Sequence, residues 1–328
     1  MAGHAPSWYA ATADALASLP PLRSDVTADV AIVGAGYTGL SAALHLAERG
    51  LKVVVVERGR IAGGASGRNG GQIHSGQRRD QDFLEQAVGR EDARRLWDLA
   101  QDAKGLVQDL IARHAIACDY RPGLIVADHK PRYVPQSHAY ARHLAEAYGY
   151  DQIEPLDREQ IRALVGSADY HGGVLDHGAG HLHPLNFALG LARAALGAGD
   201  FRLTPDGRLL FGGGESYQRH LRSEVKSFVR PFLLRIFPQL KDVTIDYGWG
   251  GTLGITMTRL PFVRRLSPHV LVSAGYSGQG VALAPLFGKI LAETLAGQIG
   301  QMDVLGRLPV PRFFGGTALR YPLLVAGL

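Results

Sequence analysis

The sequence has almost no cysteine: Cys118 is the one cysteine among 328 residues. A single cysteine excludes an internal disulfide framework and favours a reducing compartment. Long apolar runs are also missing, since no stretch approaches the ~18 apolar residues of a membrane-spanning helix. The first stretch, MAGHAPSWYAATADALASLPPL, has no basic region followed by an apolar core, so no signal peptide is expected. These absences predict a cytoplasmic protein without a transmembrane segment.

Concentrated positive charge is absent as well. The formal net charge is +5, and arginines alternate with acidic residues, as in RRDQDFLEQAVGREDARRLWD. Such mixing is typical of a solvated helix face, so no nucleic-acid partner is expected. A hydrophobic content of 46% and a charged content of 20% describe an ordinary globular protein, long enough for two domains.

A glycine-rich turn near the N-terminus lies in the stretch VAIVGAGYTGLSAALHL. Residues 34–39 match G-x-G-x-x-G between a predicted strand and a helix predicted over about 37–49. The next apolar run, LKVVVVE, ends in Glu57, which would accept hydrogen bonds from ribose hydroxyls. Gly34 permits the turn, Gly36 lets the backbone approach a diphosphate, and Gly39 lets helix and sheet pack closely. The pattern predicts a Rossmann-like βαβ unit that binds a dinucleotide, either NAD or FAD.

A second turn of this kind lies near the C-terminus, in LVSAGYSGQGVALAP. Residues 275–280 join the strand-like HVLVSA to a helix predicted over about 281–295. No strand ending in an acid follows, so this turn does not account for a second nucleotide ribose. A helix N-terminus would stabilise the negative charge that collects at N1 and the C2 carbonyl of a reduced flavin. The alternative is a tight turn without a ligand.

The remaining chain alternates predicted helices and strands. Helical spacing covers about 81–114, 136–148, 157–165, a helix from Pro184, and a stretch to about Phe237. Strand patterns cover CDYRPGLIVAD and the Gly/Trp-rich TIDYGWGGTLGITM, and FRLTPDGRLLFGGG is predicted to form a hairpin. HGAGHLH is predicted to be a loop before the Pro184 helix.

Several motifs in this order resemble one enzyme family. The two turns, with GASGRNGGQ between them and with SWYAATA, GHLHPLNFALGLA, RLLFGGGESY and WGGTLGITMTRLP, are similar to the D-amino-acid-oxidase-type superfamily of FAD-dependent oxidoreductases. The likeness is greatest to its bacterial γ-glutamylputrescine oxidase-like branch. It implies an α/β fold, a Rossmann-like FAD-binding domain with an interleaved, smaller α+β substrate domain built on a mixed sheet. The implied FAD domain takes residues 1–80, the helix at 181–199 and 264–328, and the substrate part takes 81–180 and 200–263.

The resemblance also implies which residues bind FAD. The residues that bind the ADP half would be Gly34, Gly36, Tyr37, Thr38 and Gly39 of the first turn, together with Glu57 and Arg58 after the next strand. The flavin would be lined by Ser66, Asn69, Gly70, Gly71 and Gln72, and its pyrimidine edge by Gly275, Gly278, Gln279, Gly280 and Val281. Relatives commonly have histidine at the position of Gln279, so only a backbone role is implied there. GITMTRLP has no cysteine to attach the flavin, so FAD would be bound non-covalently.

One departure from the family concerns its middle. Relatives carry a sizeable segment between the GLARAAL helix and the FRLTPDGRLLFGG hairpin, whereas here only GAGD lies between them. A segment is therefore absent between Gly199 and Phe201, which predicts a less enclosed FAD pocket and a smaller substrate domain. Because of this missing segment, a protein that binds flavin without catalysing a reaction is an alternative of another class.

The implied reaction is oxidation of a primary or secondary amine of polyamine or amino-acid type. A hydride passes from the carbon bearing the amine to flavin N5, and water hydrolyses the resulting imine. O₂ or another acceptor then reoxidises the flavin. A sarcosine-, glycine- or D-amino-acid-type enzyme is the alternative of the same class, and the second turn disfavours an NAD-dependent dehydrogenase.

Candidate substrate residues are aromatic or basic. Tyr247, Trp249 and Tyr276 could hold the ammonium group by cation–π contact, although core packing is the commoner role of such rings, and Trp249 is the strongest candidate. Arg68 is a candidate for a substrate carboxylate or an ordinary surface arginine. The histidines of the middle region do not fit a structural zinc pattern, and no metal is expected at His171, His177, His181 and His183.

Overall fold

The computed structural model describes residues 4–16, 19, 21–197, 210–212, 224–298, 300–311 and 316. Near its N-terminal end lies the predicted βαβ unit. Strand β1 (Val30–Val33) pairs in parallel with β2 (Val53–Val56), and helix α2 (Tyr37–Ala47) connects them. Chain reversal after α2 uses Gly50, whose φ of +79° suits glycine. The unit predicted from the first glycine turn is confirmed.

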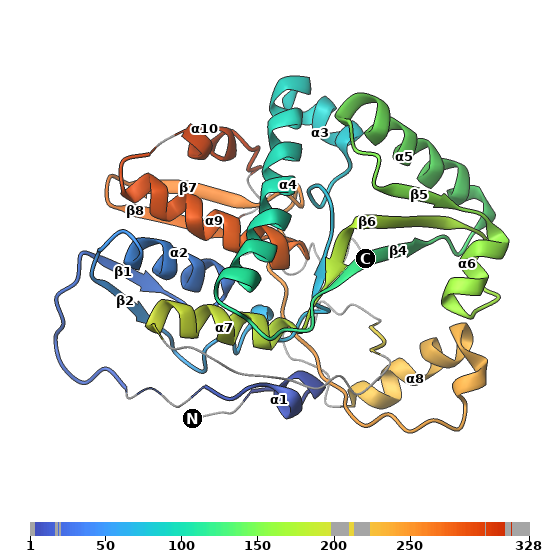
Figure 1. Ribbon diagram of the computed structural model, residues 1–328, viewed down its shortest axis with the longest axis horizontal. Coiled ribbons are helices and arrows are strands. Elements are labelled where there is room, and N and C mark those ends of the chain that lie inside the picture. Colours follow the sequence, from blue (N-terminus) through green and yellow to red (C-terminus); the bar gives the residue numbers. More distant parts are fainter. Residues whose placement is uncertain are drawn as a thin grey trace.

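The C-terminal unit lies directly beside it. Strands β7 (Phe262–Ser267) and β8 (Val270–Ala274) form an antiparallel hairpin that leads into α9 (Gly280–Leu295). Helices α2 and α9 pack side by side (Figure 1), and a Cβ at Gly288 would collide with the Thr38 carbonyl oxygen. The buried Ser41 Oγ donates to the Pro285 carbonyl oxygen over 2.6 Å. The two ends of the sequence therefore form one packed unit.

Further helices surround this pair. Helix α7 (Pro184–Leu196) packs on α2, and α1 (Trp8–Thr12) packs on α7. Helix α4 (Arg90–Arg113) packs on α9, and α10 (Gly300–Gly306) lies beside β7. Most buried apolar side chains of α2, α4, α7 and α9 belong to one core cluster. Burial of this cluster is the main stabilising term of the arrangement.

A second sheet lies on the other side of α4 (Figure 1). Its central strand, β6 (Gly173–His181), pairs with β3 (Gln72–Ile73), β4 (Arg121–Ala127) and β5 (Ile153–Leu156). All these ladders are antiparallel, whereas a mixed sheet is predicted. The surrounding helices are α3 (Gln81–Val88), α5 (Val134–Tyr148), α6 (Arg158–Val165) and α8 (Val225–Ile236). Short 3₁₀ turns lie at Ala65–Gly67, Pro131–Tyr133 and Pro238–Leu240.

Two local predictions are wrong. The predicted loop at HGAGH is the end of β6, because Gly178 and Gly180 leave room for the rings of Tyr150 and Tyr120 over the strand. The Gly/Trp-rich segment 244–257 is irregular instead of a strand, since no described strand pairs with it. Its Leu253 is 49% exposed. Most of the predicted hairpin at 201–214 lies outside the described residues.

The outer side of β1 is open. Among the described residues β1 pairs with β2 alone, and Val33 at its end is 89% exposed. A Rossmann-like sheet normally has further strands beyond such an edge. The sheet around the first glycine turn is therefore smaller than the fold class leads one to expect.

Candidate functional site

The first glycine turn presents free backbone N–H groups. Gly34 has a φ of +103°, and Gly36 is the N-cap residue of α2 without a side-chain cap. No described residue accepts a hydrogen bond from the N–H groups of Thr38 and Gly39 in the first turn of α2. Free N–H groups at a helix N-terminus are the usual receptors of a diphosphate.

Glu57 is fixed at the end of β2 beside this turn. Its Oε2 accepts from the Ala35 N–H over 2.9 Å, and its Oε1 accepts from the Gly59 N–H over 2.8 Å. These bonds hold the carboxylate while further lone pairs stay available for sugar hydroxyls. The neighbouring Arg58 is exposed.

The loop at residues 63–72 closes over the same turn. Ser66 Oγ accepts from the Tyr37 N–H over 3.1 Å, and a Cβ at Gly36 would come within 2.9 Å of that oxygen. The Asn69 amide donates to the carbonyls of Ala65 and Ser66 and accepts from the Gly71 N–H. Asn69 thus shapes the loop, which leads into β3 with Gly70 and Gln72 at its entrance.

The second turn has the same character. Gly275 and Gly278 have φ values of +70° and +101°, and Ser277 between them adopts +51°. Gln279 is the N-cap residue of α9 and forms no side-chain cap. Among the described residues no acceptor binds the N–H groups of Gly280 and Val281.

The two turns converge. Thr38 Oγ1 lies 2.6 Å from the Tyr276 hydroxyl, which joins the start of α2 to the turn before α9. Gly288 packs against Thr38 and lies eight residues after Gly280, the first residue of α9. The N-terminus of α9 is therefore roughly 12 Å from the level of Thr38, measured along the axis of α9. Both helix N-termini therefore belong to one region, separated by a distance that one dinucleotide spans.

The segment around Trp249 connects the loop and the second turn. Its indole N–H donates to the Arg68 carbonyl oxygen over 3.2 Å, and Arg68 Nε donates to Gly63 O over 2.8 Å. Further along, Gly254 O accepts from the Ser277 N–H over 3.1 Å. The predicted residues Trp249 and Arg68 are thus in contact, while Tyr247 is 37% exposed.

The site also includes residues for which the sequence predicts no role. The ring of Tyr9, from α1, lies edge-on 5.4 Å from that of Trp249 and 4.9 Å from that of His183. His183 caps α7, since its Nδ1 accepts from the Asn186 N–H over 3.1 Å. Burial lowers the pKa of His183 to about 4, so the ring is neutral and its Nε2–H donates to Thr12 Oγ1. The motifs SWYAATA and GHLHPLN were the signal, but their mutual contact is tertiary.

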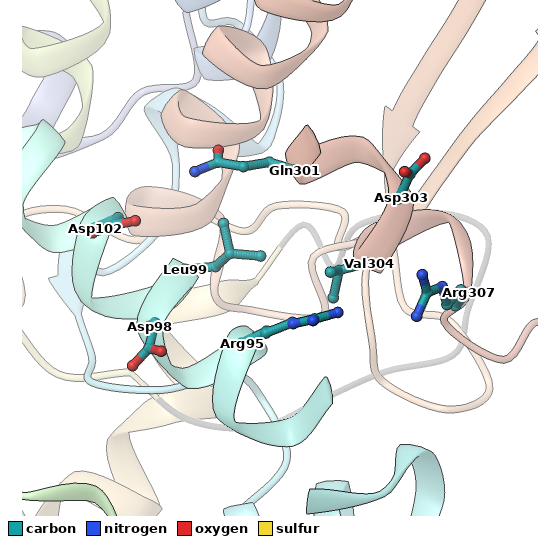
Figure 2. A pocket seen from close by; sticks show the side chains of 8 residues that line it. All are labelled: Arg95, Asp98, Leu99, Asp102, Gln301, Asp303, Val304 and Arg307. Carbon is teal, nitrogen blue, oxygen red and sulfur yellow. The ribbon is translucent and has the colours of Figure 1, made fainter. Parts of the chain in front are cut away.

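The other histidines and acids do not form a comparable cluster. Within the described part of the chain, no group of three or more His, Cys, Asp or Glu side chains is placed to hold a metal ion. His177 contacts Glu154 on the exposed side of β6. A hollow of about 370 Å³ lies between α4 and α10, lined by Arg95 and Asp98 on one side and Asp303 and Arg307 on the other (Figure 2). It contains none of the predicted site residues.

No helix in the described residues combines the length and the apolar character that crossing a bilayer requires. Among the described helices α4 is the longest, at 24 residues, and charged side chains are distributed along it. Its buried positions instead face the core.

Comparison with known proteins identifies the fold. The structure is similar to glycine oxidase from Bacillus cereus ATCC 14579, with a TM-score of 0.67, 17% identity, and coverage of 88% of this chain and 100% of that one. It is also similar to L-proline dehydrogenase from P. horikoshii, with a TM-score of 0.62, 17% identity, and coverage of 85% and 94%. These likenesses confirm the predicted α/β fold class.

Sequence comparison extends over the whole chain. The γ-glutamylputrescine oxidoreductase of Escherichia coli (strain K12) is 34% identical over 416 residues, covering 100% of this chain and 97% of that protein. The probable oxidoreductase OrdL of Rhizobium meliloti (strain 1021) is 34% identical over 408 residues, covering 98% and 95%. Since this chain has 328 residues, the E. coli alignment includes at least 88 positions without a counterpart here.

The family match locates that gap. The DAO family, described as FAD dependent oxidoreductase, matches residues 29–202 and again 198–294. The break coincides with the predicted absence of a segment after Gly199.

The residues present fit FAD. The free N–H groups at the start of α2 suit its diphosphate, Glu57 suits its ribose, and the N-terminus of α9 suits the electron-rich edge of the reduced flavin. Only glycine at position 36 leaves the approach to Ser66 open. The family model matches more than two thirds of the residues of the chain, and relatives above 30% identity cover almost its whole length. The chain therefore belongs to the DAO family of FAD-dependent oxidoreductases.

Proposed function

We propose that this protein oxidises a primary or secondary amine of polyamine or amino-acid type, such as γ-glutamylputrescine. The observation that carries the proposal is the 34% identity with the E. coli γ-glutamylputrescine oxidoreductase over the full chain. The convergence of the two glycine turns supports it, because both halves of FAD then have a receptor. The single chemical contribution of FAD, bound without a covalent link, is to accept a hydride from the carbon that bears the amine.

The proposed cofactor site follows the two turns. The ADP half lies at residues 34–39, Glu57 and Arg58, and the flavin lies between the loop at 66–72 and the turn at 275–281. We also infer the division of the chain into an FAD part (1–80, 181–199, 264–328) and a substrate part (81–180, 200–263). Helix α4 packs on α9, so the two parts share a core.

The proposed substrate contacts use Trp249 and Arg68. We propose that the Trp249 ring, held through its N–H to Arg68 O and against Tyr9, packs against an ammonium group beside the flavin loop. The Arg68 guanidinium is anchored through Nε, which leaves its terminal nitrogens for a carboxylate. The sequence predicts an amine contact for Tyr276 too, but its hydroxyl lies 2.6 Å from Thr38 Oγ1, and the contact is not part of the proposed site. A cytoplasmic location stays a prediction.

The spectrum and anaerobic reduction of the purified protein test this function. A yellow protein whose flavin is bleached by γ-glutamylputrescine, and less by sarcosine, glycine or D-alanine, is the expected result. Bleaching by sarcosine or glycine alone favours the alternative of the same class. Peroxide formed in air identifies O₂ as the acceptor, and its absence despite flavin reduction indicates another acceptor.

Arg68→Gln sharpens the substrate assignment. The variant should raise KM about tenfold for γ-glutamylputrescine, since a charged hydrogen bond to carboxylate is lost. Putrescine has no carboxylate, so its KM should stay unchanged and serves as the internal control. An equal rise for both amines would contradict a carboxylate contact.

A second function, flavin binding without catalysis, has one observation in its favour. The segment next to Trp249 is open, with Leu253, Ile255 and Met257 exposed by 49%, 46% and 55%. An open pocket admits water and weakens the electrostatic effects that catalysis needs. A yellow protein whose flavin no amine reduces would establish this alternative.

A further inference from the structure

The Tyr276 hydroxyl occupies a junction between the two turns. It lies 2.6 Å from Thr38 Oγ1, in the first turn of α2, and 2.8 Å from Ser273 Oγ, in β8. The ring packs at 5.8 Å against Phe287 on α9. Both polar contacts of this side chain are therefore made within the protein.

The chemistry of this contact favours a structural link between ligand-binding elements. Burial raises the pKa of Tyr276 to about 12, so the hydroxyl keeps its proton at neutral pH. A neutral hydroxyl donates one hydrogen bond and accepts others, so Thr38 and Ser273 satisfy it together. These two contacts take up two of the hydrogen-bonding sites of the hydroxyl, which has one donor and two acceptor positions.

The position of the junction is distinct from the general packing of the two helices. Two further contacts hold α2 and α9 together without Tyr276: Gly288 packs against Thr38 O, and Ser41 Oγ donates to Pro285 O. The Tyr276 hydroxyl acts closer to the ligand, where the second turn meets the start of α2. Removing it leaves the helix bodies packed while the two turns lose their direct connection.

We propose that Tyr276 is a positioning residue that holds the two turns at the spacing of one FAD molecule, instead of a contact to the amine. The inference rests on the cofactor site of the proposed function. A ligand that touches both turns gains from their fixed spacing, because less conformational freedom is lost on binding. A ligand that touches only the first turn gains nothing from it.

Tyr276→Phe in the full-length protein tests the proposal. The dissociation constant of FAD, measured by quenching of flavin fluorescence, should rise about tenfold on loss of the linking hydrogen bonds. The dissociation constant of ADP, which reaches the first turn alone, should stay unchanged. Tyr148→Phe is a matched control, because it removes a hydroxyl bonded to Glu85 outside the turns, and should change neither constant.

Thr38→Val provides an independent variant of the same contact. It should weaken FAD to a similar degree, and the double variant with Tyr276→Phe should be no weaker than the single ones, because partners in one bond are not additive. Additive losses would overturn the proposal.

The other outcomes also decide the matter. Unchanged FAD affinity with a raised KM for the amine would make Tyr276 a substrate contact and overturn the proposal. Equal weakening of FAD and ADP binding, together with a lower Tm, would show that Tyr276 contributes only to general stability and would overturn the proposal. If FAD alone weakens but no amine is ever oxidised, the proposed amine oxidation fails while the role of Tyr276 stands.

Discussion

The two glycine turns share a local pattern but differ in their neighbours. The first follows a strand paired in parallel with β2, and Glu57 at the end of β2 is bonded to the turn itself. The second follows an antiparallel hairpin, and its Ser277 N–H is bonded to the carbonyl of Gly254 in the segment that carries Trp249. The same strand–turn–helix element therefore faces an acid in one case and the proposed substrate region in the other. A glycine turn supplies N–H groups, and its surroundings decide which part of a ligand they receive.

The largest expected effect comes from a steric clash in the first turn that has no counterpart at Gly278 in the second. In Gly39→Ala the new Cβ would collide with the Gly34 carbonyl oxygen, which forces α2 away from the first turn. We expect a loss of about 3 kcal/mol in unfolding free energy. FAD should be absent from the purified variant, as measured by its absorption spectrum.

Gly105→Ala is the matched control for that variant. Gly105 lies within α4 and a Cβ there meets no atom within 4 Å. The change should retain FAD and raise helix stability by up to about 1 kcal/mol. Normal FAD content in Gly39→Ala would contradict the close packing assigned to the first turn.

The second turn should respond through strain alone. Gly278→Ala places a side chain at a φ of +101° with open space around the Cβ. We expect a cost of about 2 kcal/mol in unfolding free energy, measured by denaturant unfolding. If this variant loses FAD and Gly39→Ala keeps it, the contrast between the turns is reversed.

The pH dependence of stability tests the surroundings of His183, which caps α7 and packs against Tyr9. The pKa of His183 falls from 6.5 to about 4 on folding because the ring is buried. The unfolded chain therefore binds more protons between these values, so stability is full above pH 6.5 and falls as pH drops toward 4. When the pH is lowered from neutral to ~5, protonation of this group in the unfolded chain should lower the free energy of unfolding by about 2 kcal/mol.

His183→Asn isolates this contribution. Asparagine can still cap α7 but does not titrate, so the variant should lose about 2 kcal/mol less than the wild type over the same pH range. Denaturant unfolding at both pH values measures the difference. Identical pH profiles for the two proteins would show that His183 titrates normally.

The smallest expected effect concerns the acid that distinguishes the first turn. Glu57→Gln keeps the shape of the side chain but removes its charge from the Ala35 and Gly59 N–H groups and from the ribose. FAD affinity should fall about tenfold, as for loss of a charged hydrogen bond. The FAD reduction potential should not change, because the acid lies at the ADP half. A shift in potential would indicate that both turns act on the same end of the ligand.

Local patterns predicted much of the framework. The βαβ unit, the helix from Pro184 and the closing strand–turn–helix lie where the sequence places them, because each depends on residues close in the chain. The end of β6 and the segment at 244–257 were mispredicted, since both depend on distant partners. Gly178 and Gly180 form a strand because Tyr150 and Tyr120 cover them, whereas no strand in the described part of the chain pairs with the Trp249 segment.

The sequence by itself determined the two turns and Glu57, because spacing and residue type within each motif carry that information. The absence of a segment after Gly199 was implied by the resemblance to the family. Only the tertiary structure decided that Thr38 meets Tyr276 and that Tyr9 and His183 support Trp249. The physical reason is that these contacts join residues more than a hundred positions apart, and only the packing of α2, α7 and α9 into one core brings them together.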